Sequence, residues 1–76
     1  MHREHTRRER QAEIINKAIK RGDKKVSLRL YTSEARWWRD SYSLPIEPSP
    51  DSIPENERKN EQTYFFDISA LKDMIY

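Results

Sequence analysis

The side chains best suited to chemistry in this sequence are arginines and lysines, which crowd its first half. Residues 1–40 hold 12 Lys and Arg against 6 Asp and Glu, whereas residues 41–76 hold 3 against 7. Such cations neutralise phosphates, and exposed aromatic rings can stack on nucleic-acid bases. We therefore expect the basic half to bind DNA or RNA. The candidate residues are Arg7, Arg8, Arg10, Lys17, Arg21, Lys24, Lys25, Arg29 and Arg36.

The same charges also fit the solvated face of an ordinary helix. Glu4, Glu9 and Glu13 are interleaved with the arginines, and their charges weaken the positive field. A basic stripe without acidic residues would be a stronger sign of nucleic-acid binding. Both interpretations remain open at the level of the sequence.

Two adjacent tryptophans, Trp37 and Trp38, stand out in a chain that is only 34% hydrophobic. Adjacent helix positions point about 100° apart, so both rings cannot lie at the centre of one buried stripe. Trp38 shares a face with Tyr42 and is assigned to the core. Trp37, between Arg36 and Arg39 in the chain, either covers another element of its own chain or forms an interface hot spot.

The second hypothesis is therefore a small protein–protein interaction module that modulates a larger protein. Its contact residues would be Trp37, Tyr31 and Arg39, together with an aromatic strand and a Pro-rich segment. Accessory proteins of phages and other mobile elements are similarly small, highly charged and without catalytic groups, which is an analogy and not evidence.

Catalytic and metal-binding patterns are weak. His2 and His5, with Glu4 between them, could offer two ligands to a metal ion, but a structural site needs more. No nucleophile stands beside a credible base, and Gly22 is the only glycine, so no glycine loop can cradle a phosphate. We expect no enzymatic activity, no metal or other cofactor, and no small-molecule substrate.

Length and composition favour one small domain over residues 1–76. The absence of Cys suits a reducing compartment. No apolar run approaches the roughly 18 residues that a membrane span needs, and the charged start has no apolar segment behind it. We expect a cytoplasmic protein that does not bind membranes.

Periodicity predicts the elements of the first half. A helix over 7–21 follows from the Thr6/Glu9 capping box, from apolar residues at helical spacing and from Gly22 at the end. Alternation of apolar and polar residues predicts a strand over 25–31. A second helix over 33–42 would begin at a Thr32 or Ser33 cap.

The second half is less regular. All four prolines fall within residues 43–62, which predicts a long loop or a partly disordered linker. An aromatic strand over 63–68 and a short helix over 69–75 would follow. The expected fold is thus α+β, with three helices and two strands in the order α-β-α-loop-β-α. Because two strands make a poor sheet, we expect a homodimer.

The segment KKVSLRLYTSEARWWRD, about 17 residues, resembles the strand and first helix of ribbon-helix-helix repressors. In that family the strand pairs with its twin in a dimer, and its outward polar residues read the DNA major groove. The Pro-rich stretch stands where the family has a second long helix. The resemblance therefore carries over one expectation, that Lys25, Ser27 and Arg29 face a ligand.

Overall fold

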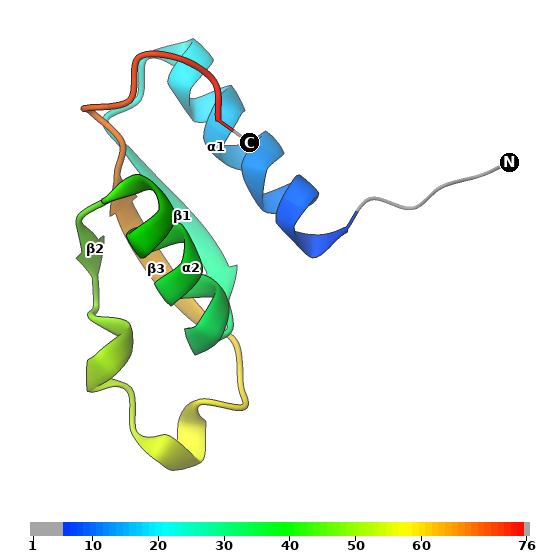
Figure 1. The fold of residues 1–76 in the computed structure, drawn as a ribbon, viewed down its shortest axis with the longest axis vertical. Coiled ribbons are helices and arrows are strands. Elements are labelled where there is room, and N and C mark those ends of the chain that lie inside the picture. The colour runs from blue at the N-terminus through cyan, green and yellow to red at the C-terminus, as the bar shows by residue number, and fades with distance from the viewer. Residues whose placement is uncertain (1–5, 76) are drawn as a thin grey trace, which may run out of the picture.

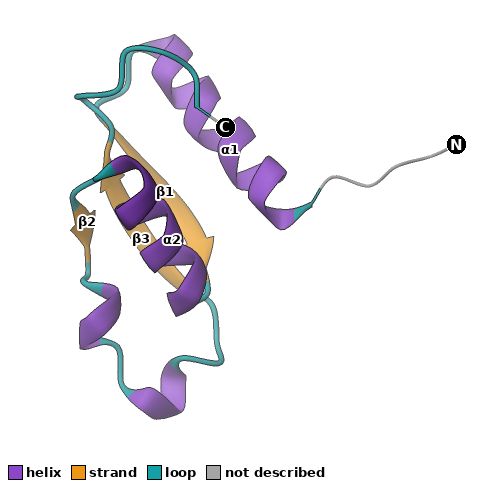
Figure 2. Cartoon of the chain, viewed as in Figure 1, coloured by secondary structure: helices purple, strands orange, loops and turns teal. Residues whose placement is uncertain are grey.

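The computed structural model describes residues 6–75, so the possible metal ligands His2, Glu4 and His5 lie outside the described residues. Two helices and a three-stranded antiparallel sheet form a small α+β domain (Figures 1 and 2). The elements are α1 (Arg7–Arg21), β1 (Lys25–Leu30), α2 (Thr32–Tyr42), β2 (Ile46–Glu47) and β3 (Gln62–Asp67), with 3-10 turns η1 (Pro50–Ser52) and η2 (Glu55–Glu57) between β2 and β3.

Helix α1 has the predicted bounds because both ends are capped as the sequence indicates. The Thr6 hydroxyl accepts the Glu9 N–H at 3.1 Å. Gly22 adopts a left-handed φ of 79°, and its N–H donates back into the last helical turn, a conformation that glycine reaches without steric cost. The predicted apolar stripe is buried at Ala12, Ile15 and Ala18.

Helix α2 begins one residue earlier than predicted, and its cap differs. Tyr31, rather than Thr32 or Ser33, is the N-cap residue. The Glu34 carboxylate accepts the Tyr31 N–H at 3.0 Å, which satisfies one of the unpaired donors at the start of the helix. Thr32 becomes the first helical residue and is buried.

The sheet has the strand order β1-β3-β2, and α2 lies over one of its faces (Figure 1). Helix α2 crosses this face of the sheet, whereas α1 lies alongside β1 and runs in the opposite direction (Figure 1). Trp38 of α2 is fully buried in the core, as the sequence predicts. The strand residues that point toward the helices and are buried are Val26, Leu28, Leu30, Tyr64 and Phe66.

The Pro-rich segment contains a third strand, so the prediction of two strands and a plain loop over 43–62 is wrong. Strand β2 pairs with β3 in the register Ile46↔Phe66. Pro45 and Pro48 lie directly before and after β2. Proline has no N–H to donate to a neighbouring strand, so it is typical of edge strands such as β2. The segment is also anchored in the core through Leu44, Pro50 and Ile53.

The helix predicted over 69–75 is also wrong, because the described residues after β3 form a turn and an irregular tail. The Asp67 carboxylate accepts the N–H and the hydroxyl of Ser69 at 2.9 and 2.6 Å, which turns the chain. Asn16 of α1 then donates to the Ile75 carbonyl and accepts the Ile75 N–H. Nucleating a helix is unfavourable, and a helix of seven residues forms few hydrogen bonds to offset that free energy. The two hydrogen bonds between Asn16 and Ile75 hold the tail instead.

The expectation of a homodimer rested on a two-stranded sheet. Strand β2 supplies the third strand within the same chain, so the fold provides no ground for a dimer. Strand β1 likewise pairs with β3, from Lys25↔Asp67 to Leu30↔Gln62, and not with a twin as in the ribbon-helix-helix arrangement.

Candidate functional site

No element formed by residues 6–75 covers the face of the sheet turned away from α2, and we call it the open face. Its side chains are those of Lys25, Ser27, Arg29, Glu47, Thr63, Phe65 and Asp67. All are exposed except Asp67, which is half-buried. Phe65 lies in the central strand, opposite Ser27 on one side and Glu47 on the other. With 51% of its surface exposed, Phe65 is a large aromatic residue in the middle of a polar face.

Two cations lie on either side of this ring along β1. Lys25 and Arg29 are two residues before and after Ser27 and so share its face, about 13 Å apart along the strand. Arg29 reaches Glu61 only at 4.0 Å and keeps 70% of its side chain exposed. Lys25 has no ion-pair partner among residues 6–75.

A hollow of about 120 Å³ adjoins Phe65 at the Lys25 end of the open face. Its walls are formed by Lys25, Pro45, Ile46, Glu47, Phe65 and Asp67. Hydrogen bonds from the Ser69 side chain and N–H hold the pKa of Asp67 below its usual value, helped by the charges of Lys25 and Lys24. The hollow therefore combines a ring, a cation and acceptor carboxylates.

Helix α1 borders the open face along the β1 side. A second hollow, of about 130 Å³, is lined by Arg7, Arg10, Gln11, Ile14, Arg29 and Glu61. Arg10 and Ile14 therefore lie next to Arg29. Lys17 shares the helix face of Arg10 two turns further on, about 10 Å along the axis. Since α1 runs opposite to β1 (Figure 1), Lys17 is displaced toward the Lys25 end. We call Arg10, Ile14 and Lys17 the α1 flank.

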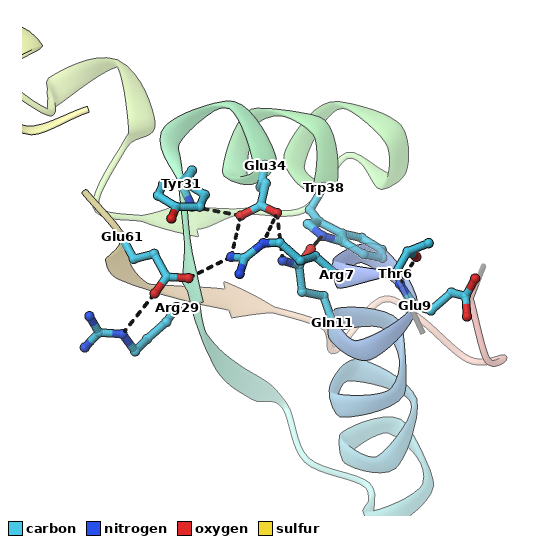
Figure 3. A network of polar contacts seen from close by, with 9 residues as sticks. All are labelled: Thr6, Arg7, Glu9, Gln11, Arg29, Tyr31, Glu34, Trp38 and Glu61. Atoms are coloured by element: carbon cyan, nitrogen blue, oxygen red, sulfur yellow. Dashed lines mark hydrogen bonds and ion pairs between the residues drawn. The ribbon is translucent and has the colours of Figure 1, made fainter. Parts of the chain in front are cut away.

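Arg7, by contrast, is neutralised by carboxylates of its own chain, although its side chain is exposed. Figure 3 shows its guanidinium bound to the Glu34 carboxylate at 2.9 and 3.0 Å and to Glu61 at 2.7 Å. Gln11 donates to the same Glu34 carboxylate and accepts the indole N–H of Trp38 at 2.7 Å. The hydrogen bond from Arg7 lowers the pKa of Glu34 to about 2. This network fastens the first turn of α1 to the start of α2.

The remaining predicted residues are scattered. Arg8 stacks over the Trp37 ring, with its guanidinium carbon 3.8 Å from the ring centroid. Trp37 is partly buried and packs against the core of its own chain, and Arg8 of α1 lies over its ring. Tyr31 lies beneath Arg7 at 5.0 Å.

Ion pairs within the chain neutralise several other cations. Arg21 binds Asp23 at 2.9 Å, and Asp51 of η1 binds Arg36 and Arg39 at 2.9 and 3.3 Å. Arg36 and Arg39 belong to α2, on the side of the sheet opposite the open face. The nine predicted cations therefore do not form one surface, and the open face with the α1 flank gathers Arg10, Lys17, Lys25 and Arg29.

Phe65, Glu47 and Asp67 were not expected individually at the site, although they lie in the aromatic strand and the Pro-rich segment that the protein-binding hypothesis included. The sequence shows through strand alternation only that Phe65 lies on the face opposite Tyr64 and Phe66. The structure adds that these two point inward, so that Phe65 points outward. Glu47 had no such signal, since β2 has only two residues and no period of its own.

Comparison of the chain with known protein families, with curated proteins and with solved structures gave no match. Within residues 6–75, no three His, Cys, Asp or Glu side chains gather closely enough to hold a metal ion. None of the helices in that part of the chain combines the length and apolar character that crossing a membrane requires.

Proposed function

We propose that this chain is a small non-enzymatic regulator that binds nucleic acid across the open face and the α1 flank. The observation that carries the proposal is the exposed Phe65 ring between Lys25 and Arg29 on an uncovered sheet face. The cations would neutralise phosphates, and the ring would contact a base or sugar. In this proposal the protein would act by occupying the nucleic acid.

The α1 flank extends the positive surface beyond the sheet. Arg10 and Lys17 have no ion-pair partner among the described residues, so their charges are available to a ligand. Arg10 lies beside Arg29 at the rim of the second hollow. Two rows of cations, on α1 and on β1, would thus follow a phosphate backbone along the same direction.

The alternative, a protein-binding module centred on Trp37, has less support in the geometry. Trp37 and Tyr31 lie beneath Arg8 and Arg7 of the same chain, and Arg39 is held by Asp51. A partner protein would have to displace these contacts before it reached the three residues.

The test is the salt dependence of binding, measured by anisotropy with labelled single-stranded and duplex probes at about 50 and 200 mM salt. The Lys25→Ala/Arg29→Ala variant should bind more weakly than wild type. Its slope of log affinity against log salt should be shallower by about 1.4, because each lost phosphate contact contributes about 0.7 for single strands.

Arg36→Ala is the matched control, since it removes an arginine from the opposite side of the sheet. It should leave the salt slope as in wild type. Absence of binding to every probe at the lower salt concentration would overturn the proposed function. Equal effects of Arg36→Ala and the double substitution would show that the open face is not the binding surface.

A further inference from the structure

We propose that the open face selects single-stranded nucleic acid and that the hollow beside Phe65 accepts an unpaired base carrying an exocyclic amino group. This inference rests on the proposed function and specifies its ligand. The base would stack on the Phe65 ring, and the Glu47 and Asp67 carboxylates would accept hydrogen bonds from the amino group. Cytosine, adenine and guanine carry such a group, whereas thymine and uracil do not.

The position of the ring favours an unpaired base. Phe65 lies in the central strand of the sheet, with β1 and β2 on either side, and 51% of its surface faces outward. Bases inside a duplex are covered on both faces by their neighbours and offer only their edges to a protein. A ring in the middle of a sheet reaches the flat side of a base only when that base is unstacked.

The hollow would select between bases, because it presents carboxylates on one part of its wall and a cation on another. Glu47 and Asp67 line it as hydrogen-bond acceptors, and Lys25 lines it as a cation. Cytosine and adenine present N–H₂ donors, whereas thymine presents a carbonyl oxygen at the corresponding position. A carboxylate attracts the donor and repels the carbonyl. Lys25 is then placed to contact a phosphate of the same strand.

The acceptor capacity of Asp67 is only partly used within the chain. Its Oδ1 atom accepts both hydrogen bonds from Ser69, and no described residue donates to its Oδ2 atom. Glu47 is exposed and has no hydrogen bond to another described side chain. Both residues therefore keep free acceptors at the hollow.

The two carboxylates also make the inference distinguishable from simple charge attraction. Negative charges near a phosphate backbone weaken binding to every sequence alike. Glu47→Gln should therefore strengthen binding to thymine oligomers while reducing the preference for cytosine. A purely electrostatic surface would gain affinity for both oligomers by the same factor.

The experiment compares labelled oligo-dC and oligo-dT of about 12 nucleotides, within the site sizes of known single-strand binders. The wild type should prefer oligo-dC by about tenfold, the size expected for one good base contact. Phe65→Ala should weaken binding to both oligomers about tenfold. Ser41→Ala, at an exposed position of α2 on the opposite side of the sheet, is the control and should leave both affinities unchanged.

Equal affinity for oligo-dC and oligo-dT, or an unchanged affinity of Phe65→Ala, would overturn this inference while leaving the proposed function intact. Absence of binding to any nucleic acid would overturn both. A second measurement needs only the wild type: amide chemical shifts on titration with CMP or UMP. Shifts at Glu47, Phe65 and Asp67 with CMP and not with UMP are expected, and equal shifts would contradict the proposed selectivity.

Discussion

Glu34 is the residue on which the junction of the two helices depends. Its carboxylate accepts hydrogen bonds from Arg7 and Gln11 of α1 and from the Tyr31 N–H at the start of its own helix (Figure 3). All three donors favour the ionised form, and the bond from Arg7 contributes most to the lowered pKa. Glu34 thus both caps the start of α2 and forms an ion pair with Arg7, which lies 27 positions earlier in the chain.

The first prediction at this scale is a dependence of stability on pH. The pKa of Glu34 falls from 4.5 to about 2 on folding, so its stabilising effect is present above about pH 4.5 and is lost as pH falls toward 2. Glu34→Gln should cost about 1–3 kcal/mol of unfolding free energy near neutral pH. Urea titrations of both proteins between pH 7 and pH 3 measure the difference.

The difference between wild type and Glu34→Gln should shrink as the pH approaches the acid end of this range. Comparing the two proteins cancels the contributions of other carboxylates, including Asp51 and Asp67, whose pKa values are also lowered. A difference that stayed constant over the whole range would mean that the charge of Glu34 does not stabilise the fold.

Among the elements, the tail after β3 is the one whose position depends on a single side chain. Asn16 makes two hydrogen bonds to the Ile75 backbone, at 3.1 and 2.7 Å. Leu71 and Ile75 are partly buried against the core. The tail covers apolar surface without forming a regular element, and the amide of Asn16 replaces the backbone hydrogen bonds that a helix would have made.

Asn16→Ala should therefore release the tail. The expected cost is about 1–2 kcal/mol, with faster hydrogen exchange at the amides of Leu71 and Ile75. Glu13→Ala, at an exposed position of the same helix, should change neither stability nor exchange. Unaltered protection of the tail in Asn16→Ala would show that packing of Leu71 and Ile75 alone holds it in place.

At the scale of the whole molecule, β1 is an edge strand with α1 alongside it, and its outer backbone groups have no strand partner among the described residues. The Ile68 N–H donates to the Lys24 carbonyl at 2.8 Å, and the register then turns the N–H and C=O groups of Lys25, Ser27 and Arg29 toward the free edge. Antiparallel pairing of two copies about Ser27 would place Lys25 of one opposite Arg29 of the other. Such like-charge pairs destabilise a sheet and protect its edge.

We therefore predict that the wild type sediments as a monomer at micromolar concentration. Lys25→Thr/Arg29→Thr should self-associate more strongly, because it removes the repulsion and leaves a strand of high β propensity at the edge. Sedimentation equilibrium measures both. A wild-type dimer that these substitutions weakened would contradict this explanation, since the cations would then stabilise the pairing.

What the sequence determined by itself is local. Caps and the 3.6-residue period were sufficient for α1, the alternation of apolar residues was sufficient for β1, and aromatic and β-branched residue content was sufficient for most of β3. The burial of Trp38 also followed from its place on a helix face. These features depend on residues a few positions apart, whose relation along the chain is set by helix or strand geometry alone.

The tertiary structure decided everything that joins distant segments. Strand β2 has two residues and no period, and it exists only because it pairs with β3. The tail is held by a residue 59 positions away, and Arg7 is neutralised by Glu61, which is 54 positions away. Phe65 belongs visibly to an aromatic strand, but only the arrangement of the helices shows which face of that strand stays open. Periodicity specifies which side of an element is apolar, whereas the packing of the whole chain determines what covers it.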